Sequence, residues 1–338
     1  MITFEENRMF DVVPLGRIAI DFNPLDIHRT LDKSKNFNKY LGGSPANIAV
    51  GLARLGKKVG FIGKVSDDAF GQFVIDYFAN EGIDVTQVHR AKNGENLGLT
   101  FTEIKSETES SILMYREGVA DLQLDCTEIS EEYIKNTKAL LISGTALAKS
   151  PSREACFKAI ELAKKHKTKV IFDLDYRSYT WQSKDEIAIY YSLVGRQSDM
   201  IMGSEEEFAL MEGILAPKDR SDKAIAKRWL DFGNEIIVIK HGKDGSEAFL
   251  KDGTSFKIKP FPVKLLKSFG GGDAYASAFL YGLLEGYEVI DALEFGSASA
   301  AMLVASHSCS EDMPKVEEIQ QFIKEKKEEY GEMIARFE

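Results

Sequence analysis

Cysteine and long apolar runs are scarce in this 338-residue sequence. Its three cysteines, Cys126, Cys156 and Cys309, lie far apart and form no Cys-x-x-Cys pair, which argues against a disulfide framework and a zinc site. Sparse cysteine is typical of the reduced cytosol. No stretch approaches the roughly 20 apolar residues of a membrane span, and residues 1–10 lack the apolar run of a signal peptide. We therefore expect a cytoplasmic protein with no membrane partner.

Positively charged residues are also fewer than negatively charged ones. Lysine and arginine total 43 against 53 aspartates and glutamates, which gives a formal net charge of −10. An acidic surface repels phosphate backbones, so we expect no nucleic-acid partner. ATP remains a possible ligand, because backbone amides and Mg²⁺ can supply a local positive field. The five histidines share no metal-ligand spacing.

The common phosphate-binding signatures are absent. The sequence has no Gly-x-x-x-x-Gly-Lys-[Ser/Thr] loop and no Gly-x-Gly-x-x-Gly after its first predicted strand. It also lacks the protein-kinase set of His-Arg-Asp together with Asp-Phe-Gly. These absences exclude the P-loop, dinucleotide-binding and protein-kinase classes.

Short apolar runs alternate with amphipathic stretches from end to end. We expect strands at Val12–Ile20, Val59–Lys64, Ala139–Ile142, Lys169–Leu174, Asp199–Met202 and Glu235–Lys240. We expect helices at Pro45–Leu55, Asp68–Glu81, Arg153–His166, Asp185–Val194 and Asp222–Phe232. The alternation predicts an α/β fold with a mainly parallel sheet, and the continuously apolar strands predict helices on both faces. No linker divides the chain, so we expect one domain over residues 1–338, with a helical tail at Lys315–Phe337.

One region departs from this alternation. Residues 97–116 hold two β-rich runs around a polar turn at Lys105–Ser110, which predicts an antiparallel hairpin. Phe37–Leu41 is a candidate third strand beside it. We expect residues 35–42 and 96–117 to form a small β lid over the edge of the sheet. Lid strands with exposed apolar faces often pair, so a homodimer through the lid is a further expectation.

Three glycines and an aspartate, Gly270-Gly271-Gly272-Asp273, precede a small-residue helix predicted at Ala274–Leu284. Glycine lets the backbone come close to a bound group, and a helix N-terminus binds phosphate. Asp273 is then placed to accept a hydroxyl proton while the amides hold the transferring phosphoryl group. The alternative is a glycine-rich turn with an N-capping aspartate.

A second glycine pair, Gly42-Gly43, precedes another predicted helix. Ser44 can cap this helix, so the helix itself needs no functional explanation. Asn47 is a poor helix former, yet it stands in the first turn. We therefore regard Asn47 as a candidate hydrogen-bonding partner of a polyol.

Two charged positions follow predicted strands. In open parallel sheets, ligands gather outside the carboxyl ends of the strands. Asp21 ends the first predicted strand, and Asp173-Leu-Asp175-Tyr-Arg177 closes the strand at Lys169–Leu174. Arg177 can bind a carboxylate or phosphate through its fork of donors. The alternative is a surface Asp–Arg pair of little energetic value.

Acidic residues follow the strand predicted at Asp199–Met202. Ser204-Glu-Glu206-Glu207 has the pattern of a capping box, and acidic residues favour the first turn of a helix. Mg²⁺ keeps several waters and takes few protein carboxylates. Glu207, together with Glu206, is therefore also a candidate to order water around magnesium.

A glycine turn closes the strand predicted at Glu235–Lys240. It reads Lys240-His-Gly242-Lys-Asp-Gly245 and precedes a strand expected at Ser246–Leu250. Glycine backbone at Gly242 and Gly245 could flank a nucleotide. By itself the segment is a simple turn between strands.

Taken together and in order, these motifs resemble the ribokinase family of carbohydrate kinases, also called the phosphofructokinase B family. Gly42-Gly43-Ser-Pro-Ala-Asn47-Ile-Ala49 matches the family's N-terminal Gly-Gly-x-x-x-Asn-x-Ala signature. Gly270-Gly271-Gly272-Asp273 matches its C-terminal Gly-Ala-Gly-Asp with one exchange. The resemblance covers about Asp11 to Ile323. It implies a three-layer ribokinase-like α/β fold with a β lid, a sugar substrate, and ATP and Mg²⁺ as cofactors.

The resemblance also implies roles for single residues. It implies Asp273 as the base, the amides of Gly270, Gly271 and Gly272 as the anion hole, sugar contacts from Asp21, Gly42, Gly43 and Asn47, and nucleotide contacts from Lys240, Gly242, Gly245, Ser204 and the stretch from Ala298 to His307. The family's Asn-x-x-Glu for magnesium is Ser204-Glu-Glu-Glu207 here, so the glutamate matches and the asparagine does not. The Asp-Thr that often precedes the glycine turn is replaced by Leu266-Lys267-Ser268-Phe269, so a monovalent-cation site is uncertain.

Longer sequence segments indicate a narrower class of substrate. Gly16–Pro24, Asp173–Trp181, Leu266–Gly282 and Ala305–Pro314 are similar to a bacterial subgroup of the family that phosphorylates the terminal hydroxyl of a linear six-carbon keto-acid sugar. Such a carboxylate needs a cationic partner, and the candidates are Arg17, Arg116 and Arg177, with Lys240 behind them. The alternatives are a kinase of the same family acting on 2-keto-3-deoxygluconate or fructose, and a catalytically silent sugar or nucleotide sensor. The intact motif ending in Asp273 argues against the sensor.

Overall fold

The computed structural model describes residues 2–106 and 109–337 of the chain. Its main sheet has ten strands in the order β14-β13-β12-β11-β10-β9-β8-β1-β4-β5. The strands from β5 to β11 in this order run parallel, and β12, β13 and β14 continue the sheet antiparallel. Their bounds are β1 (Phe10–Leu15), β4 (Gly60–Val65), β5 (Asp84–Arg90), β8 (Thr137–Ser143), β9 (Lys169–Asp173), β10 (Met200–Ser204), β11 (Ile236–Lys240), β12 (Ser246–Leu250), β13 (Ser255–Ile258) and β14 (Ile334–Phe337).

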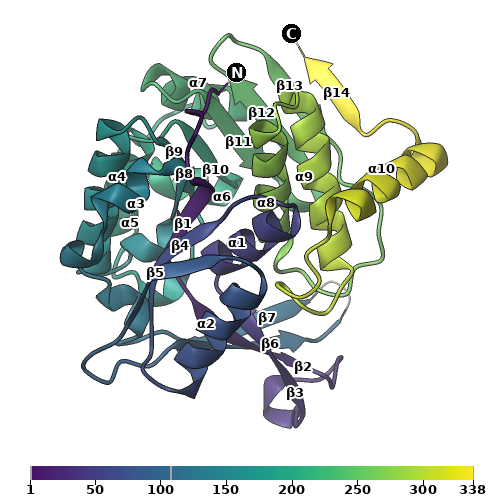
Figure 1. Ribbon diagram of the computed structural model, residues 1–338. Helices are drawn as coiled ribbons and strands as arrows, with labels where there is room; N and C mark the ends of the chain where they lie inside the picture. The colour runs from purple at the N-terminus through teal and green to yellow at the C-terminus, as the bar shows by residue number, and fades with distance from the viewer. Residues whose placement is uncertain (1, 107–108, 338) are drawn as a thin grey trace.

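Helices cover both faces of this sheet, as the continuously apolar strands predict. In β8 the side chains alternate between two cores: Leu141 packs with the helices of one face, and Leu140 and Ile142 pack with those of the other. The first face carries α1 (Ser44–Arg54), α2 (Ala69–Asn80), α8 (Gly271–Leu284), α9 (Val289–Val304) and α10 (Val316–Tyr330). The second carries α3 (Glu131–Lys135), α4 (Ser152–Lys165), α5 (Lys184–Gly195), α6 (Glu205–Met211) and α7 (Asp222–Asp231). Figure 1 shows the resulting three-layer α/β fold, and the expected fold class is confirmed.

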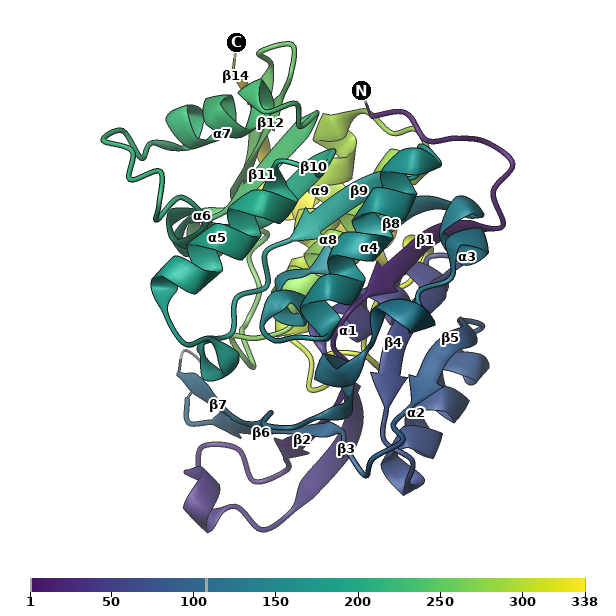
Figure 2. The same cartoon turned by 90° about the vertical axis from the view of Figure 1, so that its left-hand side faces the viewer.

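A smaller four-stranded sheet lies below the main sheet (Figure 2). Its order is β3-β2-β6-β7, with bounds β2 (Ala19–Pro24), β3 (Phe37–Gly42), β6 (Gly98–Ile104) and β7 (Ser110–Tyr115). The expected hairpin is the antiparallel pair β6–β7. The expected third strand is β3, but it pairs with β2, which lies between β3 and the hairpin, so the predicted neighbourhood of β3 is wrong. Residues 107–108 of the predicted turn lie outside the described residues. We call this sheet the lid sheet.

The first predicted strand, Val12–Ile20, is wrong as a single element. The chain forms β1, leaves the main sheet at Gly16, and re-enters as β2 of the lid sheet. A Cβ at Gly16 would lie 3.0 Å from the Pro45 ring and 3.2 Å from Ser143, so glycine relieves crowding where the backbone passes α1. Asp21 therefore lies within β2 and does not end a strand of the main sheet.

The tail at Lys315–Phe337 is only partly helical. Helix α10 ends at Tyr330, because Gly331 adopts a positive φ of 79° that stops the helix. Residues Ile334–Phe337 then pair with β13 as the edge strand of the main sheet. Within the described part of the chain, no helix is long and apolar enough to cross a membrane.

Candidate active site

The glycine-rich turn begins helix α8. Gly270 is the N-cap with a φ of 86°, and the helix starts at Gly271. A Cβ at Gly270 would lie 2.5 Å from the Cys309 sulfur, and one at Gly271 would lie 2.8 Å from Val304. The first turn of a helix leaves its N–H groups without intrahelical partners, so this turn presents amide donors. Asp273 lies in the first turn and is not the N-cap, so the capping alternative is wrong.

The two motifs that the sequence separates by more than two hundred residues meet at Asp273. Its Oδ1 accepts a hydrogen bond from Ser44 Oγ at 2.7 Å, and its Oδ2 accepts one from Asn47 Nδ2 at 2.8 Å. Ser44 was expected to cap α1, but Gly43 is the N-cap and the Ser44 hydroxyl serves the aspartate instead. Burial raises the pKa of Asp273 to about 6, against the two hydrogen bonds that lower it. A carboxylate of this kind is suited to accept a proton near neutral pH.

A second buried carboxylate lies beside the turn. Asp173 ends β9, and burial together with the charges of Asp175, Glu207 and Asp273 raises its pKa to about 7, against the opposing charge of Lys240. Lys240 ends β11, with its Nζ 3.7 Å from Asp173 Oδ1. The same Nζ lies 3.7 Å from where a Cβ of Gly272 would stand. Lys240 therefore lies between Asp173 and the glycine-rich turn.

The three arginines proposed as alternatives lie in one region. Arg17 Nη2 donates to Thr100 Oγ1 at 2.7 Å, Arg116 Nη2 forms a buried ion pair with Asp121 at 2.7 Å, and Arg177 Nη2 pairs with Asp175 at 2.9 Å. Burial lowers the pKa of Arg116 to about 10, helped by the charges of Arg17 and Arg177 and opposed by Asp121.

Several buried polar atoms in this region lack a hydrogen-bond partner among the described residues. They are Nε and Nη1 of Arg116, Nε of Arg177, and Oδ1 of Asp21, Asp121 and Asn47. Unpartnered buried polar atoms are rare and costly in native proteins. These six atoms are therefore candidates to hydrogen-bond a polar molecule.

Asp21 reaches this region from the lid sheet because the next strand leaves room for it. A Cβ at Gly42, on the neighbouring β3, would lie 2.1 Å from Asp21 Oδ1, so only glycine is compatible with this carboxylate. Burial raises the pKa of Asp21, and the charge of Arg17 and a hydrogen bond from Thr100 oppose the rise. Gly43 has a φ of 100°, and its Cβ would lie 2.5 Å from the Arg17 carbonyl oxygen. The first glycine signature is therefore a steric requirement of the site.

The acidic run after β10 forms the expected capping box. Ser204 Oγ accepts from Glu207 N at 3.3 Å, and Glu207 Oε2 accepts from Ser204 N at 2.7 Å. Glu207 Oε1 also accepts from Tyr176 N at 2.8 Å. Each carboxylate oxygen keeps acceptor capacity beyond these bonds. Glu207 is half-buried near Asp173, whereas Glu206 is exposed. Of the two magnesium candidates, Glu207 therefore lies closer to the other buried carboxylates.

The remaining nucleotide candidates lie in two segments. Gly242 opens the turn after β11 with a φ of 56°, and Gly245 ends it with a φ of 95°. A Cβ at Gly245 would lie 2.0 Å from the Ile258 carbonyl oxygen, which explains this glycine by packing. His307 contacts the lid sheet: its Nδ1 lies 3.1 Å from Tyr40 Oη and its Nε2 lies 2.9 Å from the Pro24 carbonyl oxygen.

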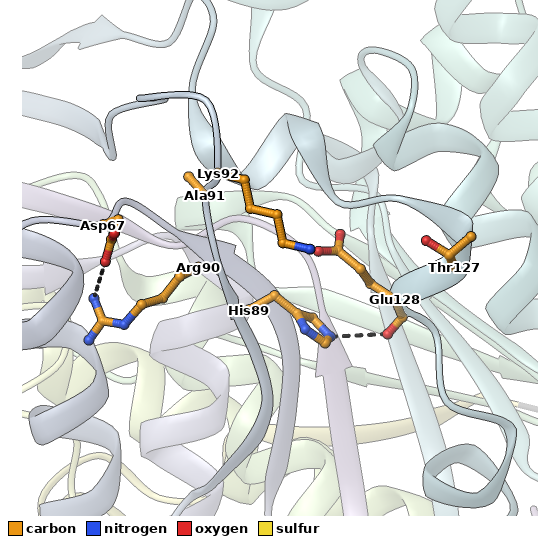
Figure 3. Close-up of a pocket in the computed structure, with 7 residues that line it drawn as sticks. All are labelled: Asp67, His89, Arg90, Ala91, Lys92, Thr127 and Glu128. Carbon is orange, nitrogen blue, oxygen red and sulfur yellow. Dashed lines mark hydrogen bonds and ion pairs between the residues drawn. The ribbon is translucent and has the colours of Figure 1, made fainter.

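An open hollow of about 610 Å³ lies elsewhere, beside the end of β5 (Figure 3). It is lined by Asp67, His89, Arg90, Ala91, Lys92, Thr127 and Glu128. His89 Nε2 there contacts the Glu128 carbonyl oxygen at 3.0 Å. None of the residues singled out from the sequence lines it, and it does not contain the unpartnered buried atoms. The region of Asp273 and the arginines is therefore the candidate functional site.

A three-layer α/β fold with a β lid and a buried aspartate in a glycine-rich helix start defines the class of carbohydrate kinases. Residues 9–316 match the model of the pfkB family carbohydrate kinases. The chain is 74% identical over 335 residues to a 5-dehydro-2-deoxygluconokinase of Clostridium perfringens, with 99% of each chain covered. It is 52% identical over 323 residues to a 5-dehydro-2-deoxygluconokinase of Geobacillus thermodenitrificans, with 96% of each covered. A solved structure of a putative ribokinase II from E. coli, in complex with ATP and Mg²⁺, superposes with a TM-score of 0.83 at 23% identity, over 94% of this chain and 99% of that one. The chain belongs to the pfkB family of carbohydrate kinases.

Proposed function

We propose that this kinase transfers a phosphoryl group from ATP to the terminal hydroxyl of 5-dehydro-2-deoxy-D-gluconate, giving the 6-phospho sugar acid and ADP in myo-inositol catabolism. High identity over the full chain to relatives of that name supports the substrate. The observation that carries the proposal is the group of three arginines beside the lid sheet, with unpartnered donors on Arg116 and Arg177. A sugar acid brings a carboxylate to this region, and a neutral sugar does not.

We propose that the sugar acid binds between the lid sheet and the main sheet. Asp21 and Asn47 hydrogen-bond its hydroxyls, and the backbone at Gly42 and Gly43 allows the close approach. Arg177 receives the carboxylate first, because its side chain is 34% exposed while that of Arg116 is 2% exposed. Arg17 and Arg116 do not receive the carboxylate first, but they add positive charge to the region that binds it.

The chemical step follows from the surroundings of Asp273. Its carboxylate takes the proton of the primary hydroxyl as that oxygen attacks the γ-phosphorus of ATP. A bond forms between the sugar oxygen and phosphorus, and the bond to the β,γ-bridging oxygen breaks, so ADP leaves with its electron pair. The amides at Gly270, Gly271 and Gly272 and the start of α8 stabilise the charge that develops on the phosphoryl oxygens.

The nucleotide is proposed to lie along the turns at Gly242 and Gly245, with Lys240, Ser204 and the His307 segment at its edges. Magnesium, when bound, neutralises phosphate charge, and Glu207 and Asp173 are the carboxylates that fit its water shell. Glu206 is exposed and is a weaker candidate. ATP and Mg²⁺ also occur together in the E. coli neighbour.

We propose that residues 1–338 act as one kinase domain whose lid, residues 35–42 and 96–117, closes over the sugar. Closure would exclude water and limit ATP hydrolysis. Strand β7 is an edge of the lid sheet and exposes Leu113 and Tyr115. This apolar edge supports a homodimer through the lid. Sedimentation velocity of the wild type and of Leu113→Lys tests it, and a wild-type monomer at micromolar concentration would refute it.

The decisive experiment is ADP release from MgATP with four acceptors: 5-dehydro-2-deoxygluconate, 2-keto-3-deoxygluconate, fructose and no sugar. We expect kcat/KM for the first to exceed the others at least ~100-fold, equivalent to roughly 3 kcal/mol. If the enzyme prefers another sugar, the proposed substrate is wrong, but the assignment of the site residues stands. Binding of ATP without turnover of any sugar would favour the silent sensor.

A further inference from the structure

A lysine lies fully buried next to the glycine-rich turn. Lys267 has an exposed fraction of 0% and is among the largest fully buried side chains. Its Nζ donates to the Ser308 carbonyl oxygen at 2.5 Å. Among the described residues, no carboxylate forms an ion pair with it. An ammonium group without a counter-ion costs several kcal/mol to bury, so stability alone does not account for this residue.

Lys267 joins the two segments that surround the glycine-rich turn. The amides of Leu266 and Lys267 both donate to the Val304 carbonyl oxygen, at 2.9 and 3.2 Å, so this backbone is fixed to the end of α9. Gly270 follows three residues later. Its missing Cβ leaves the space that the Cys309 sulfur occupies, and Cys309 is the neighbour of Ser308. The ammonium group therefore holds the segment that packs against the turn.

That segment, residues 306–312, also reaches the lid sheet. His307 Nε2 contacts the Pro24 carbonyl oxygen at 2.9 Å, and Ser310 Oγ donates to the Leu41 carbonyl oxygen at 3.1 Å. The same segment thus contacts both the lid sheet and the glycine-rich turn. A group that fixes it controls how the two halves of the site are positioned.

The charge of Lys267 acts on both halves of the site. Burial lowers the pKa of Lys267, and the charges of Cys309, Asp312 and Asp273 oppose this change. Burial raises the pKa of Asp21, and the charge of Lys267 is among the influences that oppose the rise. The ammonium is therefore electrostatically coupled to the proposed base and to the proposed sugar-binding carboxylate.

We propose that Lys267 is a positioning residue whose ammonium serves as the resident monovalent cation of the site, holding residues 306–312 against the glycine-rich turn. This proposal rests on the proposed function of the turn at Asp273. An ammonium group has the charge of a potassium ion and, like it, binds carbonyl oxygens. The kinase therefore reaches full activity without added potassium.

The first test removes the charge and keeps the shape with Lys267→Met. We expect kcat to fall at least tenfold while KM for MgATP changes less than threefold. The matched control is Lys64→Met, because Lys64 is also a buried lysine that donates to a carbonyl oxygen, of Gln123 at 3.0 Å, but it pairs with Glu128 away from the site. The control should lower Tm and leave kcat within twofold. A folded Lys267→Met enzyme that keeps more than half of the wild-type kcat would overturn the proposal.

The second test restores the cation from solution. Lys267→Ala should regain activity in ammonium chloride along a saturable curve, and tetramethylammonium chloride should have no effect. Wild-type kcat should agree within twofold in potassium, sodium and tetramethylammonium salts. A wild-type requirement for potassium would contradict the proposal even if both variants fail to fold. Each assay uses whichever sugar the wild type phosphorylates, so a wrong substrate would refute the proposed function without affecting this test.

Discussion

The site has two ends of opposite electrostatic character. The aspartate end holds Asp173 and Asp273 beside Lys240, and the arginine end holds Arg17, Arg116 and Arg177. Asp173 and Asp175 stand two positions apart at the same strand end, yet their pKa values move in opposite directions. The pKa of Asp173 is raised to about 7 by burial and neighbouring carboxylates. Burial also acts to raise the pKa of Asp175, but the charges of Arg177 and Arg17 outweigh it and the pKa is lowered.

This difference assigns a different task to each end. Carboxylates with raised pKa values at the aspartate end can accept a proton at physiological pH. At the arginine end, Asp175 has a lowered pKa, stays ionised and holds the Arg177 guanidinium in place for an anion. One substrate that carries a hydroxyl at one terminus and a carboxylate at the other matches both ends. Substitutions at each end alone test this division of tasks.

The largest effect is expected at the aspartate end from Asp273→Asn. The amide keeps the shape but cannot take the proton, and general-base catalysis contributes about 10²–10⁴-fold. We expect kcat to fall by about three orders of magnitude, while calorimetry should find ATP affinity within threefold of wild type. Asp219→Asn, at an exposed aspartate, is the control, and its kcat and ATP affinity should equal those of the wild type. A variant that keeps more than a tenth of wild-type kcat would remove Asp273 as the base.

The arginine end should respond in a substrate-dependent way. Arg177→Met removes a donor fork from the carboxylate, and truncating one partner of a buried charge pair costs about 2–5 kcal/mol. We expect kcat/KM for the sugar acid to fall about 100-fold, consistent with the lower part of that range. Turnover of a sugar that lacks the carboxylate should change less than threefold.

Two further variants complete this test. Arg177→Lys should recover part of the loss, because it keeps the charge but not the fork. Arg220→Met, in the loop before α7, is the control. Equal losses for charged and neutral sugars would mean that Arg177 acts on the fold and not on the carboxylate.

The local chemistry of each motif could be predicted from the sequence, but the contacts between motifs could not. The alternation of strands and helices gave the layers, and the capping box at Ser204 is present as expected. The break at Gly16 was missed because the crossing depends on Pro45, which is distant in sequence. For the same reason, Ser44 was expected to cap its helix when it bonds Asp273. Charge pairing across elements, as between Lys240 of β11 and Asp173 of β9, needs the order of the strands, which no local pattern contains.

The pH dependence of kcat/KM should reflect the titration of the aspartate end. Because the base must be ionised, kcat/KM should fall as the pH drops through about 6, the raised pKa of Asp273. Ser44→Ala removes a hydrogen bond that favours the charged carboxylate and lowers its pKa. The acid limb should then move to higher pH by about one unit or more, since a hydrogen bond to a charged group contributes roughly 1.5 kcal/mol or more and one pKa unit is about 1.4 kcal/mol. Activity at pH 8 should change little. Ser192→Ala in α5 is the control, and a limb that stays in place or moves to lower pH would contradict the assignment.

The smallest effect is expected at the capping box, where structural and functional roles can be separated. Glu207→Gln removes the negative charge and keeps one acceptor oxygen for the amides of Ser204 and Tyr176, because the new NH2 group cannot accept a hydrogen bond. Because a capping contact contributes about 1 kcal/mol, we expect Tm to fall by only a few degrees. If Glu207 orders water around magnesium, the Mg²⁺ concentration for half-maximal rate should rise severalfold while KM for the sugar stays constant. Glu206→Gln, an exposed neighbour with the same chemistry, should change neither quantity. An unchanged Mg²⁺ dependence in Glu207→Gln would leave this glutamate with its capping role alone and transfer the magnesium assignment to Asp173.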